Sequence, residues 1–242
     1  MTKQENIYFL KVTLLYNKIN IRKVEVHMSS IDKTRELILN SALELFIEKG
    51  YHETSTNDIR IRANNLSRGG LYHYFPRKED ILNALPEYLL PYKASLDNLM
   101  ENTDLTAMEK IRLLLKENYK GVMSTSKGVM FLKLLSGSES LNFLFDNLKS
   151  SIVPLYEQLI RMGNEDGSMN ITEPEYTAEF LAILLNIWFN PLFLKTVGTE
   201  EEIDGRINFL ENTTNFLGLS LFDEEIRELC KSLWLTLSEI EN

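Results

Sequence analysis

The sequence predicts an all-α protein in which a small N-terminal three-helix unit is followed by a larger helical body. Beyond residue 80, no strand-like alternation of apolar and polar residues appears, and segments with a helical period follow one another. Before residue 80, two short helical patterns are separated by the pair Asn64-Asn65, and a longer amphipathic pattern precedes them. The 242 residues are enough to bury a sizeable core.

Residues 1–27 mix apolar and basic residues, with neither the cleavage site of a signal peptide nor an apolar run long enough to span a membrane. Met28 precedes Ser29 and Asp32, where the first helix of the N-terminal unit is expected to begin. We interpret residues 1–27 as an extension that results from a start site placed too early. The alternative is a basic arm that adds non-specific contacts to nucleic acid.

The first helix is expected over residues 32–49. Ile38, Ala42 and Phe46 recur at helical spacing with Leu45 alongside, and Gly50 supplies a helix stop. This helix would brace the two short helices that follow it.

The two short helices have recognisable start and stop signals. Ser55 and Asp58 resemble a capping box, in which a hydroxyl and a carboxylate satisfy the free N–H groups of a helix start. Asn64 and Asn65 end this helix, because asparagine tolerates the left-handed conformation of a tight turn, and Ser67 caps the next one. The apolar face of the first short helix consists of Ile59, Ala63 and Leu66.

The second short helix has an almost bare outer face. Leu71 and Phe75 are four residues apart and define its inner face, whereas Gly69 and Gly70 leave the outer side without bulk. A glycine in a helix costs about 1 kcal/mol relative to alanine, so the pair indicates close approach to another surface. Side chains that can contact phosphates and base edges surround this patch: Arg68, Tyr72, His73 and Tyr74.

These features resemble the signature of the tetracycline-repressor (TetR/AcrR) family of bacterial transcription regulators. The resemblance rests on G-Y-x-x-T-S at 50–55 and on L-S-R-G-G-L-Y-H-Y-F-P-R-K-E-D at 66–80, and it covers about a fifth of the chain. One extra residue between Ile59 and Leu66 implies a longer turn and a slightly re-aimed recognition helix. The alternative is an ordinary helical hairpin that binds no DNA. The residues that the resemblance and the motif assign to DNA contacts are Thr54, Ser55, Thr56, Ser67, Arg68, Gly69, Gly70, Tyr72, His73, Tyr74 and Lys78.

The resemblance divides the chain into a helix-turn-helix domain at 28–78 and a ligand-binding and dimerisation domain at 79–242. Prolines 86, 91 and 154 are expected to kink or break the body helices. The body helices are expected near 79–100, 106–124, 127–135, 140–163, 174–197, 204–218 and 223–240.

Two body segments are candidates for a dimer interface. Residues 180–194 are apolar nearly all round, yet they are too short and too interrupted for a membrane span. The last helix repeats apolar residues at spacings of three and four. A four-helix interface between two subunits would use Leu184, Ile187, Ile226, Leu229, Leu233 and Leu237.

The resemblance also implies a pocket in the body that controls the DNA-binding modules. Methionine and aromatic side chains would favour an apolar or aromatic effector, and the candidate lining residues are Met123, Met130, Phe131, Phe143, Phe180 and Trp188.

The net charge of −9 is unevenly distributed: +3 over residues 1–27, +2 over 28–78 and −14 over 79–242. Because phosphate neutralisation drives much of DNA binding, a weakly basic module on an acidic body indicates modest affinity for each subunit and a need for two.

Nothing in the sequence supports catalysis, a metal site or a cofactor. His27, His52 and His73 are scattered, and neither an H-E-x-x-H motif nor a glycine-rich phosphate loop occurs. The single cysteine, Cys230, lies in an apolar helical pattern, which fits an inert thiol in a reducing cytoplasm. We therefore expect a cytoplasmic protein with no membrane partner.

The leading interpretation is a ligand-responsive transcriptional regulator, a repressor as most members of the resembled family are, that binds a palindromic operator in double-stranded DNA as a homodimer. The second interpretation is a helical DNA-binding or protein-interaction module without a small-molecule effector. An all-α enzyme is the third.

Overall fold

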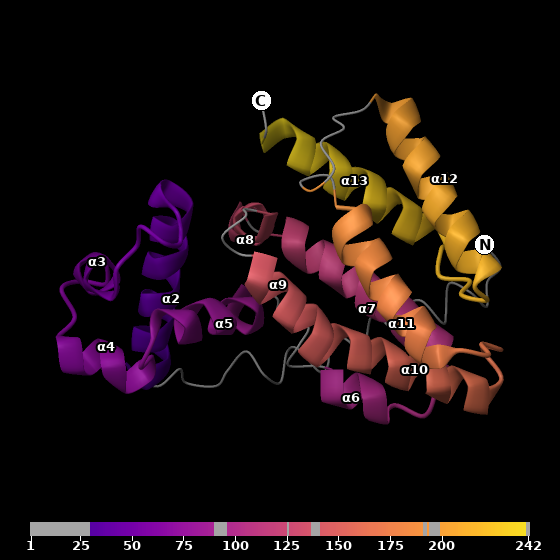
Figure 1. Ribbon diagram of the computed structural model, residues 1–242, viewed down its shortest axis with the longest axis horizontal. Helices are drawn as coiled ribbons and strands as arrows, with labels where there is room; N and C mark the ends of the chain where they lie inside the picture. Colours follow the sequence, from indigo (N-terminus) through magenta and orange to yellow (C-terminus); the bar gives the residue numbers. More distant parts are fainter. Residues whose placement is uncertain are drawn as a thin grey trace, which may run out of the picture.

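Every regular element of the described chain is a helix, which confirms the expected all-α class (Figure 1). The computed structural model describes residues 30–89, 96–124, 126–136, 141–190, 193 and 199–240. The interpretation of residues 1–27 and the bend expected at Pro91 lie outside the described residues.

The N-terminal unit consists of α2 (Ser30–Lys49), α3 (Thr56–Arg62), α4 (Arg68–Tyr74) and α5 (Lys78–Leu89). Helix α2 packs against α3 and α5, so it braces the short helices as expected. The apolar faces identified in the sequence point into this unit, where Ile38, Ala42, Phe46, Ile59, Ala63, Leu71 and Phe75 are all buried.

The body contains α6 (Leu96–Glu101), α7 (Ala107–Met123), α8 (Ser126–Ser136), α9 (Leu141–Asn147), α10 (Val153–Asp166), α11 (Pro174–Ile183), α12 (Glu200–Phe216) and α13 (Glu224–Ile240). The π-helical segments η3 (Leu148–Ile152) and η4 (Leu184–Trp188) interrupt the α-helical pattern. They join α9 to α10 and extend α11.

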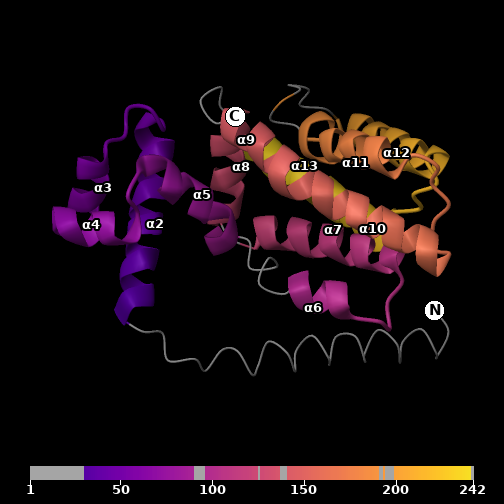
Figure 2. The same cartoon turned by 60° about the horizontal axis from the view of Figure 1, so that its bottom comes forward.

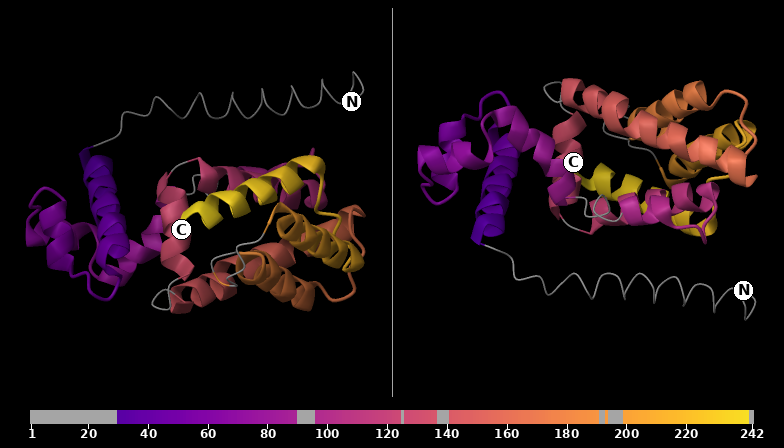
Figure 3. Two further views of the ribbon diagram at one scale, coloured as in Figure 1. Left: turned by 90° about the horizontal axis from the view of Figure 1, so that it is seen from above. Right: turned by 90° about the horizontal axis from the view of Figure 1, so that it is seen from below.

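The N-terminal unit lies at one end of the long axis of the molecule and the body lies at the other (Figures 1 and 3). Helix α5, the last helix of the N-terminal unit, leads to the body, and α8 of the body packs against α2 (Figure 2). A polar contact strengthens this junction. The Tyr88 hydroxyl of α5 lies 3.1 Å from Glu36 Oε1 and 2.9 Å from Asn40 Oδ1 on α2, and Lys127 Nζ of α8 donates to the same Asn40 oxygen at 2.6 Å.

Helix α7 lies at the centre of the body, where it packs against α8, α10 and α13. Gly128 permits the close approach of α8 to α7, because a Cβ atom there would lie 2.4 Å from the Val122 carbonyl oxygen. Trp234 of α13 is buried and donates from Nε1 to the Phe189 carbonyl oxygen at 2.9 Å, which fixes the end of η4 against α13. Lys116 of α7 forms ion pairs with Asp223 and Glu225 at the start of α13.

The expected breaks occur where backbone chemistry requires them. Pro154 lies in the first turn of α10, directly after η3, where its missing N–H group leaves no interior hydrogen bond unmade. Pro86 lies inside α5, which continues to Leu89. The segment expected as one helix over 79–100 contains α5 and the separate short helix α6.

Candidate nucleic-acid interface and ligand cavity

Helix α3 begins with the capping box that the sequence predicts. The backbone N–H of Asp58 donates to Ser55 Oγ at 3.1 Å, and the backbone N–H of Ser55 donates to Asp58 Oδ2 at 2.9 Å. Lys49 at the end of α2 donates to the same carboxylate at 2.7 Å. The Lys49 ammonium and the Ser55 donors together hold the pKa of Asp58 below its usual value. The start of α3 is therefore tied to α2.

The turn between α3 and α4 uses the asparagine pair as expected. Asn64 and Asn65 have φ values of 56° and 53°, which is the left-handed conformation that asparagine tolerates better than most residues. Arg60 stabilises the turn, because its Nη1 donates to the Leu66 carbonyl oxygen at 3.2 Å. No sequence motif marks this arginine. Its contact sets the path of the chain into α4.

Helix α4 presents one exposed face. Ser67 caps it by accepting the N–H of Gly70 at 3.0 Å, and Arg68, Gly69, Tyr72 and His73 are exposed. Thr56 at the start of α3 lies beside this face, because its Oγ1 is 3.4 Å from the Tyr72 hydroxyl. The structure thus brings together the outer side chains of both short helices, at the end of the molecule away from the body (Figure 2). Tyr74 is half-buried and packs on the core.

The two glycines of α4 differ in their surroundings. A Cβ atom at Gly69 would have nothing within 4 Å, so this position is the open part of the face. A Cβ atom at Gly70 would lie 3.0 Å from Ser67 Oγ and 3.2 Å from the Leu66 side chain. Gly70 therefore makes room for the helix cap, and Gly69 is the glycine that permits close approach of another surface.

Two residues that were expected to contact DNA, Thr54 and Lys78, direct their side chains to backbone carbonyl oxygens of the N-terminal unit instead. Thr54 is 1% exposed, and its hydroxyl donates to the carbonyl oxygens of Gly50 (2.7 Å) and Leu45 (3.2 Å). Lys78 Nζ donates to the carbonyl oxygens of Tyr51 (2.7 Å), Thr54 (2.9 Å) and His52 (3.3 Å). These residues tie the loop before α3 to its neighbours, because their donors are used inside the unit. This corrects the expectation that they offer side chains to DNA.

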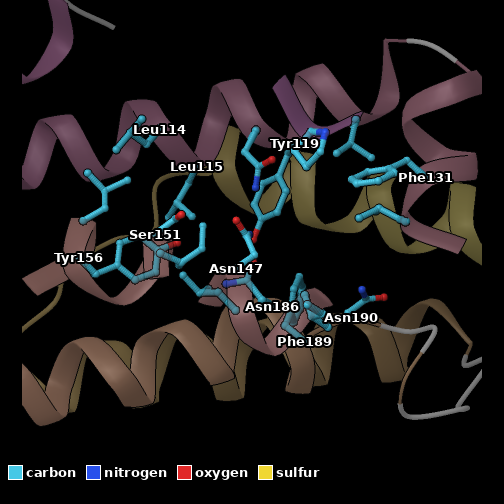
Figure 4. Close-up of a pocket in the computed structure, with 18 of the residues that line it drawn as sticks. Leu114, Leu115, Tyr119, Phe131, Asn147, Ser151, Tyr156, Asn186, Phe189 and Asn190 are labelled. Carbon is cyan, nitrogen blue, oxygen red and sulfur yellow. The ribbon is translucent and has the colours of Figure 1, made fainter. Parts of the chain in front are cut away.

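A cavity of about 210 Å³ lies in the body between α7, α8, α10, η4 and α13 (Figure 4). Its walls are mainly aliphatic and aromatic, and Pro86 of α5 also lines it. Several uncharged polar side chains interrupt these walls: Asn118, Tyr119, Asn147, Ser151, Tyr156, Asn186 and Asn190.

Two of the six residues expected to line the cavity, Phe131 and Phe143, do so. Met130 and Phe180 are exposed on the surface. Met123 and Trp188 are half-buried against other parts of the core. These four assignments are wrong because helical periodicity does not reveal which neighbour each face of a helix meets. Asn118 and Asn147 also line the cavity, but they were not predicted to do so. The available signal was an uncharged amide close to apolar residues of the same helix, which are Leu114 and Tyr119 for Asn118 and Leu144 for Asn147.

Four of the residues expected at the dimer interface are buried inside the chain: Leu184, Ile226, Leu233 and Leu237. Leu233 lines the cavity. The prediction that these four buried residues form a dimer interface is therefore wrong. The other two predicted interface residues, Ile187 and Leu229, are half-buried. The large exposed apolar side chains of this region are Tyr176, Phe180, Ile183, Phe209, Phe216 and Leu235.

Cys230 is buried, and burial raises the pKa of its thiol to about 12, which fits the expected inert thiol. Within the described ranges, no cluster of three or more His, Cys, Asp or Glu side chains could hold a metal ion. No helix in the same ranges is long and apolar enough to cross a membrane.

A capped helix-turn-helix with an open outer face, mounted on a helical body with a cavity, defines a class of DNA-binding regulatory proteins. The family model for bacterial regulatory proteins of the tetR family matches residues 38–85. YuxN of Bacillus subtilis, an HTH-type transcriptional regulator, is 42% identical over 22% of this chain and 18% of its own length.

Two other similarities extend beyond the N-terminal unit. IcaR of Staphylococcus epidermidis, the negative transcriptional regulator of a biofilm operon, is 25% identical over 71% of this chain and 91% of its own length. The structure of NalD from Pseudomonas aeruginosa has a TM-score of 0.54 and 20% identity, with 85% of this chain and 97% of NalD covered. The helix-turn-helix of this chain is therefore that of the TetR/AcrR family of DNA-binding transcriptional regulators.

Proposed function

We propose that this protein is a repressor that binds a palindromic operator as a homodimer in the bacterial cytoplasm and leaves it when a small molecule occupies the body cavity. We assign operator binding to residues 28–78 and effector binding and dimerisation to 79–242. The observation that carries the proposal is the exposed face of α4, where Gly69 leaves the backbone open beside Arg68, Tyr72 and His73.

The face of α4 suits the major groove. The described structure shows no hydrogen-bond or ion-pair partner for Arg68, so its guanidinium is available for bidentate pairing with a guanine or a phosphate. Thr56 and Ser67 lie at helix starts, where hydroxyl and backbone N–H groups commonly contact phosphates, whereas both donors of Ser55 are engaged by Asp58. The similarity to a negative regulator supports repression rather than activation.

For the dimer, we propose an interface of α11 and α12 in place of the buried residues first expected. Tyr176, Phe180 and Ile183 are spaced by four and three residues on α11, so they form one exposed apolar stripe. Phe209 and Phe216 of α12 are seven residues apart and share a face, and Phe216 is 90% exposed. The rings of Trp188 and Phe209 lie 5.3 Å apart and link the two stripes. Exposed apolar surface of this extent supports coverage by a second copy.

The cavity is connected to the DNA-binding unit through the helices that line it. Pro86 of α5 and Phe131 of α8 both contribute to its walls, and both helices pack against α2. A ligand that displaces α5 or α8 changes the Tyr88, Asn40 and Lys127 contact, and with it the spacing of the two α4 helices in a dimer. Because the two half-sites of an operator lie about 34 Å apart on DNA, the two α4 helices of a dimer can bind together only at one separation. Ligand and operator then weaken each other's binding by the same factor.

Selection of bound fragments from the source genome tests the proposal. The expected product is a short inverted repeat that the wild type binds and that Arg68→Ala binds at least tenfold more weakly. Arg161→Ala, which removes an exposed arginine of α10, is the matched control and leaves binding unchanged. Fragments without sequence preference, or a sedimentation mass of one chain on and off DNA, contradict the proposal.

A further inference from the structure

The polar groups of the cavity are all uncharged. Asn118 of α7 and Asn147 at the end of α9 face one cavity with Asn186 of η4, and no Asp, Glu, Lys, Arg or His is found among the described residues that line it. In Figure 4, Asn147 lies near Tyr119 in the middle of the cavity, and Asn186 lies beside Phe189. Hydrogen-bonding groups are therefore present without a counter-charge.

Two of these amides have no hydrogen-bond partner in the described structure: those of Asn118 and Asn147. By contrast, Asn186 Nδ2 donates to the Ala182 carbonyl oxygen at 2.9 Å, and the Tyr119 hydroxyl is paired with the Cys230 thiol. A carboxamide offers two N–H donors and one oxygen acceptor, so Asn118 and Asn147 together present donors and acceptors to any guest. Half-buried polar groups of this kind are usually satisfied by a ligand or by ordered water.

The walls near these amides depart from regular α-helix. Segment η3 contributes Ser151 and Ile152, and η4 contributes Leu185 and Asn186. π-helical turns are rare and frequently occur at functional sites, because they re-aim side chains that an α-helix would direct elsewhere. The cavity thus combines irregular backbone on two walls with unsatisfied amides.

We propose that the effector is a compact, uncharged molecule with an apolar body and a carbonyl, hydroxyl or amide group that pairs with Asn118 and Asn147. This inference rests on the effector role proposed above for the cavity. An ionised ligand would lose its hydration without gaining an opposite charge, which disfavours carboxylates and ammonium ions. The cavity is also smaller than the range of about 300–1,000 Å³ typical of drug-sized ligands, so a large ligand does not fit without rearrangement.

Three probes with eight carbon atoms each test the head-group preference: octanamide, octanoate and octylammonium. Each is titrated calorimetrically into the full-length protein at pH 7. The expected result is a Kd for octanamide at least tenfold below that of either ion. Equal or tighter binding of an ion, or no binding of octanamide, overturns the inference.

Two variants test the assigned amides, because leucine has the same number and branching of side-chain heavy atoms as asparagine and makes no hydrogen bonds. Asn147→Leu and Asn118→Leu should each weaken octanamide binding about tenfold, and Asn142→Leu, an exposed amide of the same helix α9, should not. If Asn118→Leu or Asn147→Leu retains the wild-type circular dichroism spectrum and binds octanamide with unchanged affinity, the assignment of that amide is overturned. Operator binding measured without ligand separates the two ideas. If it persists while octanamide fails, the ligand class is wrong, and if it is absent, the regulatory function is wrong.

Discussion

Replacing Lys78 with methionine separates a structural role from a DNA-contacting role for this side chain. The sequence motif assigns the ammonium group to a phosphate, whereas the structure places it on the carbonyl oxygens of Tyr51, His52 and Thr54. It also lies 4.2 Å from the centroid of the Tyr51 ring. Methionine retains most of the apolar stem and removes the charge and the donors.

The expected loss of stability follows from these contacts. Hydrogen bonds from a charged donor contribute about 1.5–3 kcal/mol when one partner is removed. Lys78 is half-buried and water can reach part of its shell, so we expect Lys78→Met to lose about 2 kcal/mol for the whole set, near the lower end of that range. For a chain of this length the loss corresponds to a fall of about 4–8 °C in melting temperature.

Three measurements follow the change. Thermal unfolding gives the stability, and hydrogen exchange of peptides that cover residues 46–62 reports whether the loop before α3 opens. Operator affinity at several salt concentrations gives the slope of log K against log[salt]. We expect faster exchange in that peptide and an unchanged slope, because each phosphate contact contributes about 0.9 to the slope and Lys78 makes none.

Arg77→Met is the matched control, since Arg77 is the neighbouring cation and its side chain is 70% exposed. Its ion pair with Asp80 is a surface pair, so stability should change by less than about 1 kcal/mol. The structural interpretation is refuted if Lys78→Met keeps the wild-type melting temperature and makes the salt slope shallower by about one phosphate contact.

Three further predictions concern the exposed face of α4, the dimer interface and stability at acid pH. Gly69→Leu should leave the fold and melting temperature intact but reduce operator affinity more than tenfold, whereas retained affinity in a band-shift assay would remove this face from the interface. Phe209→Glu should give a folded chain with the sedimentation mass of one subunit, and a persistent dimer would exclude the α12 stripe. The pKa of Asp58 is lower in the folded chain than in the unfolded chain, so its stabilising effect is present above about pH 4 and is lost as pH falls. The urea midpoint of the wild type should therefore drop more than that of Asp58→Asn between pH 6 and pH 3, and parallel profiles would show that this carboxylate does not stabilise the fold.

Local features of the N-terminal unit were predictable because they depend on residues close in the chain. The capping box of Ser55 and Asp58, the left-handed pair Asn64 and Asn65 and the Ser67 cap all formed as expected. Each involves residues no more than three positions apart or a conformational preference of one residue type. Periodicity likewise identified the inner face of each helix, since burial in one hydrophobic core repeats every three to four residues.

The tertiary structure decided what lies opposite each face. Lys78 reaches carbonyl oxygens more than twenty residues earlier in the chain, and no spacing rule connects them. Met130 and Phe180 lie on the surface, whereas Leu233, expected at a dimer interface, lines the cavity. The sequence by itself determined that these helices have apolar faces, because burial of apolar area is favourable whichever surface covers it. Only the packing of the helices decided whether core, cavity, solvent or a second subunit covers them, because the hydrophobic effect is non-directional and does not select the partner.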